Sequence, residues 1–411
     1  MRQDVQGKVD SRAMREVNRS IVLDIIRRGG RVSRTDLARR SSLTKPTVSA
    51  IVEDLIARGI VQEVGYGKTV ASGGRRARLL EFNDHSAAYL GIRFGESRIS
   101  VGIADARGEM RATSETSAIR GDASRSMAEA LKLVDQVVEA SGLPRERLQA
   151  VGVTVPGLVD QASGEVVLNS NLEWRNVPIR ALAQQEFGLP VVVSNVTNAG
   201  AIAEGRVGAA RGLRSFVWVY VGSGIGAGII IDGQVFPGSR GFSGEIGHCS
   251  IVANGPACVC GLKGCLEALA STAAITNAAR AAVSAGESTA LSDATHLDAR
   301  AIVQAANAGD AVAERVLREA GEHLGVGISY LTNLLNPQMI VIGGGMVEGS
   351  NHLIESVRTS TSKHALNHET VKIVPSALGD QGALVGAVLS AMDLSVRSYR
   401  VVATGERVVH D

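Results

Sequence analysis

The sequence predicts an α/β protein in which an N-terminal winged helix-turn-helix precedes a body of two lobes. Residues 1–80 hold 17 Lys and Arg against 8 Asp and Glu, a formal charge of +9, whereas the other 331 residues hold 26 against 33, or −7. Helical patterns fill the first 60 residues, and from Tyr89 onward short apolar strands alternate with helices. This charge asymmetry indicates that the basic head binds a polyanion and that the acidic body binds a different kind of partner.

The composition excludes several classes of protein. A chain of 411 residues that is 45% apolar and carries a net charge of only +2 is too apolar and too weakly charged to be disordered. Its 4 cysteines are too few for a disulfide scaffold. The first residues lack the apolar core of a signal peptide, and no apolar run approaches the roughly 20 residues of a membrane span. We therefore expect a soluble, cytoplasmic protein.

Two helices are predicted at the start of the head. The first covers residues 14–28, because apolar side chains recur on one helical face and Gly29-Gly30 follows them. These side chains are Val17, Ile21, Val22, Ile25 and Ile26. The second is short and runs from Ser33 to about Arg40, since Ser33 and Asp36 have the spacing of a capping box.

A third helix completes a helix-turn-helix. It begins after Thr44, a capping residue, has Pro46 in its first turn and ends before Gly59. Its buried stripe is Val48, Ile51, Val52, Leu55 and Ile56. The second helix of such a motif offers its N-terminal polar residues to the major groove of DNA. The residues expected to contact DNA from the two helices are Ser33, Arg34, Thr44, Lys45, Thr47 and Ser49.

The end of the head is typical of a wing. The segments IVQEVGYGK and ARLLEFN predict two strands around a loop rich in glycine and basic residues. Arg75 and Arg76 follow Gly73-Gly74 in this loop and are expected to reach into a minor groove. A helical dimerisation or protein-binding domain with a solvated basic face is the alternative. DNA is favoured because phosphate contacts need Lys and Arg.

The body contains two similar sets of strands and helices, one before about residue 195 and one after it. The first set predicts three strands, a helix over residues 123–140 and further strands, and the second repeats this alternation. The strand sequences are YLGIRFG, ISVGIADARG, RATSETSAI, AVGVTVPG, PVVVSN, FVWVYVGSGIGAGIIIDG and PQMIVIGGG. Two such sets predict two lobes with a cleft between them, which is a favoured place for a ligand.

The most specific local signal is a cluster of metal-ligating residue types. One imidazole and three potential thiolates occur within 18 positions, the donor set of a closed tetrahedral zinc site: His248, Cys258, Cys260 and Cys265. The alternative is a group of small unligated apolar residues. Because the set leaves no open position, we expect the zinc to be structural rather than catalytic. Cys249 lies outside it and is interpreted as a buried apolar residue.

The chain resembles the ROK family of sugar kinases and sugar-responsive repressors over roughly residues 14–392. The segments that carry the resemblance are SGGRR (72–76), VGVTVPGLVD (151–160), NSNLEW (169–174), VSNVTNAGAIAE (193–204), VGSGIGAGIIIDG (221–233), GEIGH (244–248), CVCGLKGCLE (258–267) and NPQMIVIGGG (336–345). The resemblance implies an actin-like, ribonuclease H-like fold with sugar in the cleft and zinc beside it. The implied domains are a winged helix-turn-helix over 1–83, a first lobe over 84–195 completed by a helix at about 383–395, a second lobe over 196–382 and a tail over 396–411.

Two segments depart from the pattern of the family's kinases. The family's general base is an aspartate directly after the asparagine that matches Asn195, and this chain has Val196 there. The first phosphate segment, which normally carries an acid and then Gly-Gly-Thr-Lys, has Arg93 in place of the acid and Glu96 in the turn. A valine cannot accept a proton, so the resemblance predicts a kinase fold without kinase activity.

The positions that match the family's hexose contacts are retained. They are Gly157, Asn171, Asn195, Glu245, His248 and Glu267. Carboxylates and amides suit sugar hydroxyls, and an imidazole bound to zinc keeps one nitrogen for a hydroxyl. The alternative for Glu245 and Glu267 is a solvated or structural role.

These expectations combine into a hypothesis about function. The protein is expected to be a homodimeric or homotetrameric repressor that binds double-stranded operator DNA and is controlled by a sugar or sugar phosphate in the cleft. The helix around Arg315–Leu335 is the expected interface between copies. The alternatives are a sugar kinase that also binds DNA, and a repressor controlled by a protein that docks on the zinc loop.

Overall fold

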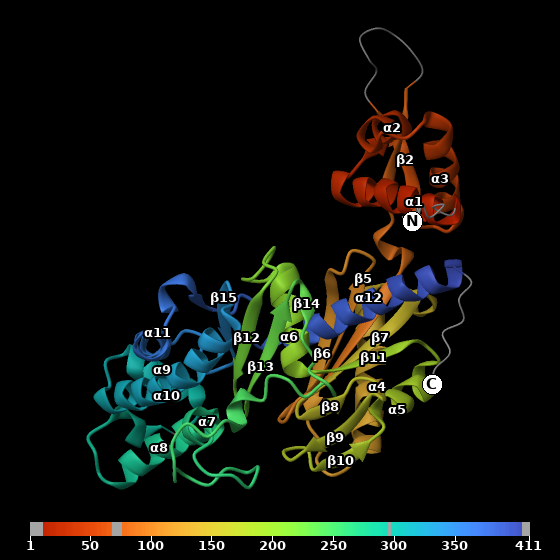
Figure 1. Cartoon of the computed structure of the whole chain (residues 1–411). Helices are drawn as coiled ribbons and strands as arrows, with labels where there is room; N and C mark the ends of the chain where they lie inside the picture. The colour runs from red at the N-terminus through yellow and green to blue at the C-terminus, as the bar shows by residue number, and fades with distance from the viewer. Residues whose placement is uncertain (1–10, 68–75, 295–296, 405–411) are drawn as a thin grey trace, which may run out of the picture.

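The computed structural model describes residues 11–67, 76–294 and 297–404. In Figure 1 the head stands at one end of the molecule, above the first lobe, and the second lobe lies beside the first. The long C-terminal helix α12 (Gly382–Thr404) crosses the first lobe close to the head. Within these residues no helix combines the length and apolar character that crossing a membrane requires.

The head has the predicted winged helix-turn-helix architecture. Its elements are α1 (Ser11–Gly29), β1 (Val32–Ser33), α2 (Arg34–Ser41), α3 (Lys45–Ala57), β2 (Val61–Tyr66) and β3 (Arg78–Phe82). The strands form an antiparallel sheet in the order β1-β3-β2. Both predicted caps are present, because the Ser33 hydroxyl accepts from the Asp36 amide at 3.1 Å and the Thr44 hydroxyl from the Thr47 amide at 3.4 Å. The sequence thus predicted both helix starts correctly.

The interpretation of α1 needs a correction. Val22 and Ile26 are fully buried in the core of the head, as expected. Val17 and Ile21, which belong to the same apolar face, are 54% and 40% exposed. The apolar arc of α1 is wider than the line along which this helix contacts α2, α3 and β3, so only one side of the arc is covered.

The first lobe is built on a mixed five-stranded sheet in the order β11-β7-β4-β5-β6. Its elements are β4 (Ala88–Phe94), β5 (Arg98–Asp105), β6 (Met110–Ser117), α4 (Ala123–Ser141), β7 (Leu148–Val155), α5 (Ile179–Phe187) and β11 (Val191–Asn195). A small antiparallel sheet is added by β8 (Leu158–Asp160), β9 (Glu165–Asn169) and β10 (Trp174–Val177). The strands β4, β7 and β11 are parallel, so their carboxyl ends share one edge.

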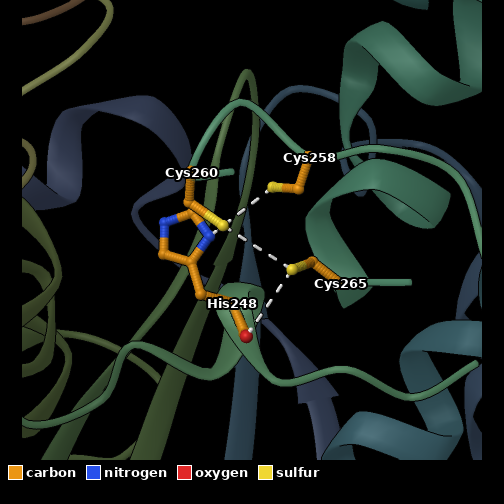
Figure 2. A group of neighbouring side chains, drawn as sticks. All are labelled: His248, Cys258, Cys260 and Cys265. Atoms are coloured by element: carbon orange, nitrogen blue, oxygen red, sulfur yellow. Dashed lines mark hydrogen bonds between the residues drawn. The ribbon is translucent and has the colours of Figure 1, made fainter. Parts of the chain in front are cut away.

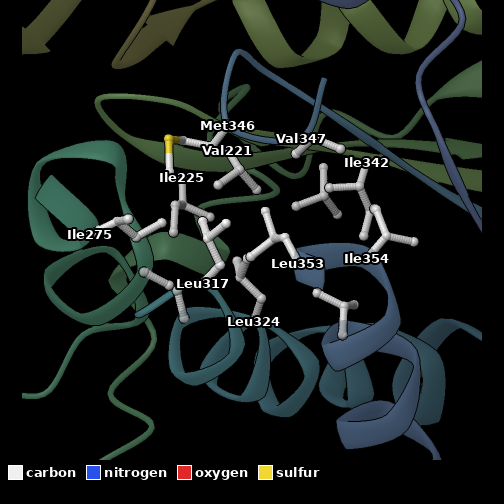
Figure 3. Packing of buried hydrophobic residues seen from close by; sticks show 14 of the residues in the cluster. Val221, Ile225, Ile275, Leu317, Leu324, Ile342, Met346, Val347, Leu353 and Ile354 are labelled. Atoms are coloured by element: carbon white, nitrogen blue, oxygen red, sulfur yellow. The ribbon is translucent and has the colours of Figure 1, made fainter. Parts of the chain in front are cut away.

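The second lobe repeats this plan with the sheet order β14-β13-β12-β15-β16. Its strands are β12 (Phe216–Val221), β13 (Ile225–Ile231), β14 (Gln234–Val235), β15 (Met339–Gly343) and β16 (Lys372–Pro375). Its helices are α6 (Val196–Val207), α7 (Leu266–Ala270), α8 (Thr272–Ser284), α9 (Ala299–Asn307), α10 (Ala311–Leu335) and α11 (Asn351–His364). Figure 3 shows the core between the sheet and α10 and α11, where Leu317, Leu324 and Leu353 are completely buried.

The helix α12 rests directly on the backbone of the first lobe. A Cβ atom on Gly152 of β7 would lie 1.9 Å from the carbonyl oxygen of Ala387, and one on Gly91 of β4 would lie 2.7 Å from Val388. Only glycine allows this approach. The predicted helix at 383–395 is therefore present, but the prediction of a separate tail from 396 is wrong, because the helix continues to Thr404. No Gly or Pro occurs between Ala387 and Thr404 to end it.

Candidate metal centre and adjoining cleft

The four predicted metal ligands come together in one loop region of the second lobe. His248 ends a short 3-10 helix after β13, and Cys265 is the N-cap of α7. Figure 2 shows the four side chains pointing toward one another, and all four ligand atoms lie within 4.8 Å of one another. Nδ1 of His248 is 3.8 Å from Sγ of Cys258, and the Sγ atoms of Cys260 and Cys265 are 3.7 Å apart.

The loop takes this shape because of its glycines and its backbone hydrogen bonds. The amide of Cys258 donates to Leu262 at 2.8 Å and the amide of Gly261 donates back to Cys258 at 3.0 Å, which closes a tight turn. Gly264 has a φ of +69°, and a Cβ there would lie 1.8 Å from the carbonyl oxygen of Val252. This position therefore requires glycine.

The chemistry of the donors suits a metal ion. Cys265 is fully buried, and burial together with the neighbouring thiols raises the pKa of Cys265 to about 12. Without a cation this sulfur stays protonated at neutral pH, whereas a bound metal would stabilise its thiolate. Three sulfurs and one imidazole nitrogen in this space could hold a metal ion.

Cys249 does not behave as predicted. Its side chain is exposed, not buried. The residue is held by its backbone, since its amide donates to Ile246 at 3.1 Å and its carbonyl accepts from Leu266 at 3.0 Å. The main chain therefore fixes this position without burying the thiol.

Two acids flank the histidine of this centre. Burial raises the pKa of both Glu245 and Glu267, while the charge of His248 opposes the shift in each case. Glu267 accepts a hydrogen bond from the amide of Ile225 at 3.0 Å, which ties the start of α7 to β13. Nδ1 of His248 faces the sulfurs, and among the residues that the structure describes no hydrogen-bond partner occupies its other ring nitrogen.

The predicted sugar residues of the first lobe, Gly157, Asn171 and Asn195, are held by three hydrogen bonds. Asn195 caps α6 by accepting from the Thr197 amide at 2.7 Å, and its side-chain amide donates to the carbonyl of Gly157 at 2.7 Å. Gly157 has a φ of +87°. Asn171 instead donates to Glu96 at 2.6 Å. No local sequence pattern predicts the contact between Asn171 and Glu96, because the two residues are 75 positions apart.

A cavity of about 270 Å³ is lined by residues of the turn between β4 and β5, among them Glu96. Val196, at the start of α6, also lines this cavity and is 7% exposed. Arg93 lines it as well and donates to the backbone oxygen of Asp380 at 2.7 Å. Burial raises the pKa of Tyr220, which lies beside Arg93 on the wall formed by β12.

The predicted DNA contacts fall into two groups. Thr44 and Lys45 are exposed at the start of α3, and Thr47 and Ser49 are half-buried there. By contrast, Ser33 is 6% exposed and its hydroxyl serves the α2 cap, so it has little surface to offer DNA.

The three predicted arginine contacts lie on α2 and in the wing loop. Arg34 is half-buried and donates to Glu63 at 3.0 Å. Arg76 is exposed, and Arg75 lies outside the described residues.

Comparison with known proteins identifies both parts of the chain. The model of the ROK family matches residues 89–393, and a model of the MarR family matches residues 16–67 of the head. The chain belongs to the ROK family. The basic head thus contains the segment matched by the MarR model, and the acidic body contains the segment matched by the ROK model.

Individual ROK relatives include both repressors and kinases. The xylose repressor of Caldicellulosiruptor bescii is 32% identical over 381 residues, which cover 91% of this chain and 95% of that protein. A crystal structure of a ROK transcriptional regulator, described as a homologue of the E. coli MLC protein, superposes with a TM-score of 0.78 at 29% identity and covers 95% of this chain and 99% of that one. A ROK glucokinase from Streptomyces griseus, solved with glucose and AMPPNP, has a TM-score of 0.68 at 29% identity and covers 75% of this chain and 100% of that one. The repressor and the regulator thus match over nearly the whole chain, while the glucokinase matches a smaller part.

Proposed function

We propose that this ROK protein is a repressor of carbohydrate-metabolism genes whose binding to operator DNA is controlled by a sugar or sugar phosphate in the cleft. The observation that carries the proposal is the combination of an exposed helix-turn-helix surface at Thr44 and Lys45 with a kinase-like cleft that has Val196 at the base position. The exposed start of α3 suits contact with the major groove of DNA, and a cleft without a general base suits sugar binding without phosphoryl transfer.

DNA recognition is assigned to the start of α3 and to the wing. Thr44, Lys45, Thr47 and Ser49 would face the major groove, and Arg75 and Arg76 the minor groove. Each phosphate contact by a basic residue adds to the salt dependence of binding. A single head reads one half-site, so the operator is expected to be a pseudo-palindrome read by two copies.

Pairing of copies is assigned to the C-terminal end of α10, in a homodimer or a homotetramer. Tyr330 and Leu334 on this helix are 38% and 81% exposed. Leu366, whose amide donates to Asn333 of α10 at 2.9 Å, is 96% exposed. Three large apolar side chains in one region support an interface there, because isolated surfaces seldom keep such a patch.

The metal is inferred to be zinc, held by His248, Cys258, Cys260 and Cys265. Three sulfurs and one nitrogen are a typical structural zinc set. When bound, zinc would neutralise the buried thiolates and fix the loop. The loop in turn would hold the free nitrogen of His248 between Glu245 and Glu267, ready for a sugar hydroxyl.

Phosphoryl transfer is not expected. A general base contributes about 10²–10⁴ to such a reaction, and Val196 cannot supply it. Arg93 in the first phosphate segment is occupied by the carbonyl of Asp380. A repressor controlled by a protein partner remains the second candidate, since Val259 and Leu262 on the metal loop are 73% and 57% exposed.

The proposal is tested by selecting bound fragments from genomic DNA and titrating the complex with sugars. We expect specific binding that one sugar or sugar phosphate releases, and we expect Thr44→Ala with Lys45→Ala to lose it. Lys132→Ala, at an exposed position of α4 in the first lobe, is the control and should bind DNA normally. Transfer of labelled phosphate from ATP to a sugar would establish the kinase instead, and release only by a cell protein would establish the second candidate.

A further inference from the structure

We propose that Glu96 is an additional sugar-binding residue, which replaces the carboxylate that position 196 lacks and selects an unphosphorylated sugar against a sugar phosphomonoester. This inference rests on the proposed function of the cleft and names the class of effector it takes. Glu96 lies in the turn between β4 and β5, outside the segments that match the family's sugar contacts.

The position of Glu96 is fixed by a predicted sugar contact. Oε1 of Glu96 accepts from the side-chain amide of Asn171 at 2.6 Å. Its second carboxylate oxygen has no hydrogen-bond partner among the residues that the structure describes. A carboxylate held by one oxygen presents the other in a defined direction, which suits a hydroxyl donor.

Glu96 also meets the acid of the opposite lobe. A Cβ atom built on Gly224 would lie 3.0 Å from an oxygen of Glu267 and 3.8 Å from an oxygen of Glu96. The two carboxylates therefore reach the same point of the cleft from different lobes. Glu96 and Val196 line the same cavity. The turn between β4 and β5 thus supplies this cavity with a negative charge that position 196 lacks.

The charges of the cavity disfavour a phosphate group. The cavity lining contains three positively charged residues and three negatively charged ones: Arg93, Arg98 and Arg300, and Glu96, Glu115 and Asp380. Arg98 pairs with Glu115 at 2.6 Å, and Arg93 donates to a backbone carbonyl. The lining therefore has no surplus of positive charge. A phosphomonoester carries about 1.5 to 2 negative charges at neutral pH and would be placed against Glu96 and Glu267.

The test measures affinities by calorimetry for two neutral sugars, xylose and glucose, and for xylose 5-phosphate and glucose 6-phosphate. For the wild-type protein we expect a neutral sugar to bind and its phosphate ester to bind at least about tenfold more weakly. Glu96→Gln keeps an oxygen for Asn171 but loses the charge, so the neutral sugar should bind about tenfold more weakly and the penalty on the ester should shrink.

Glu129→Gln is the matched control. Glu129 pairs with Lys132 on α4 and does not line this cavity, so this variant should bind the sugars and their esters like the wild type. Circular dichroism of both variants checks their fold. Esters that bind as tightly as the free sugars, or equal affinities for Glu96→Gln and Glu129→Gln, would overturn the inference and leave the sugar-sensing function standing. If none of the four compounds binds the wild type, both the inference about Glu96 and the proposed sugar-sensing function are overturned.

Discussion

The contact between the head and the first lobe leads to a prediction about how the sugar signal reaches DNA. Arg107, in the turn after β5, pairs with Asp84 at 2.5 Å and donates to the carbonyl of Arg27 on α1 at 2.8 Å. Its guanidinium also lies 5.3 Å from the ring centre of Phe82, at the end of the wing sheet. Arg107→Ala would remove all three contacts and keep the hydrogen bond that Arg27 donates to the backbone of residue 107.

The expected loss can be estimated contact by contact. The side chains of Arg107 and Asp84 are 25% and 32% exposed, so solvent screens their pair and it contributes about 1 kcal/mol. The charged hydrogen bond to Arg27 adds roughly 1 kcal/mol, and the contact with Phe82 adds about 0.5 kcal/mol. The junction would lose about 2–3 kcal/mol, which is comparable to the roughly 1–3 kcal/mol that couples two sites in an allosteric protein.

Two assays measure this effect. Limited proteolysis should release the head of Arg107→Ala faster than that of the wild type, and operator titrations with and without sugar should show a smaller effect of sugar on DNA affinity. Arg145→Ala is the control, since its exposed pair with Asp135 at 2.5 Å lies on the first lobe. If the sugar changes operator affinity by the wild-type factor in Arg107→Ala, the signal does not pass through this junction and the reasoning fails.

Three further predictions concern the head and the metal. Glu63 holds both Arg34 and Arg78, so Glu63→Gln should free two arginines and raise affinity for nonspecific DNA at low salt, and an unchanged salt slope would contradict this. The hydroxyl of Ser33 lowers the pKa of Asp36. The wild type should therefore be more stable than Asp36→Ala above about pH 4, and this advantage should disappear as the pH falls through the folded-state pKa of Asp36. Melting curves from about pH 3 to 6 measure the difference. Removing metal with a chelator should lower the melting temperature by on the order of 5 °C, and metal analysis should find one zinc per chain before treatment.

Local signals allowed the sequence to predict most of the head and the metal cluster. Ser33 and Thr44 mark helix starts through contacts three residues away, and such contacts can be read from spacing alone. The ligands of the metal centre likewise occur in one short segment. The end of α12 is not predicted because a helix stop needs a Gly or Pro signal, and the sequence has none between Ala387 and Thr404.

The parts of the site that escaped prediction depend on contacts between distant segments. Asn171 and Glu96 are 75 positions apart and meet only because β4 and the loop before β10 are brought together in the first lobe. Glu267 joins them from the second lobe. Spacing cannot reveal such a meeting, since each residue belongs to a different element. The exposure of Val17 on α1 has the same origin, because the width of a contact is set by the neighbouring elements and not by the helix itself.

The arrangement of the lobes suggests why a small closure would be enough to release DNA. The head contacts the first lobe through Arg107, and the sulfur of Met392 on α12 lies 3.9 Å from Arg27 of the head. The helix α12 packs on the glycines of β4 and β7 in the first lobe and also on α6, where a Cβ atom on Gly386 would lie 1.9 Å from the carbonyl oxygen of Ala199, so α12 lies at the junction of the lobes (Figure 1). The proposed pairing surface on α10 belongs to the other lobe. A sugar that draws the lobes together would therefore rotate each head relative to the paired copies, and two heads that must span half-sites about 34–36 Å apart would no longer dock together.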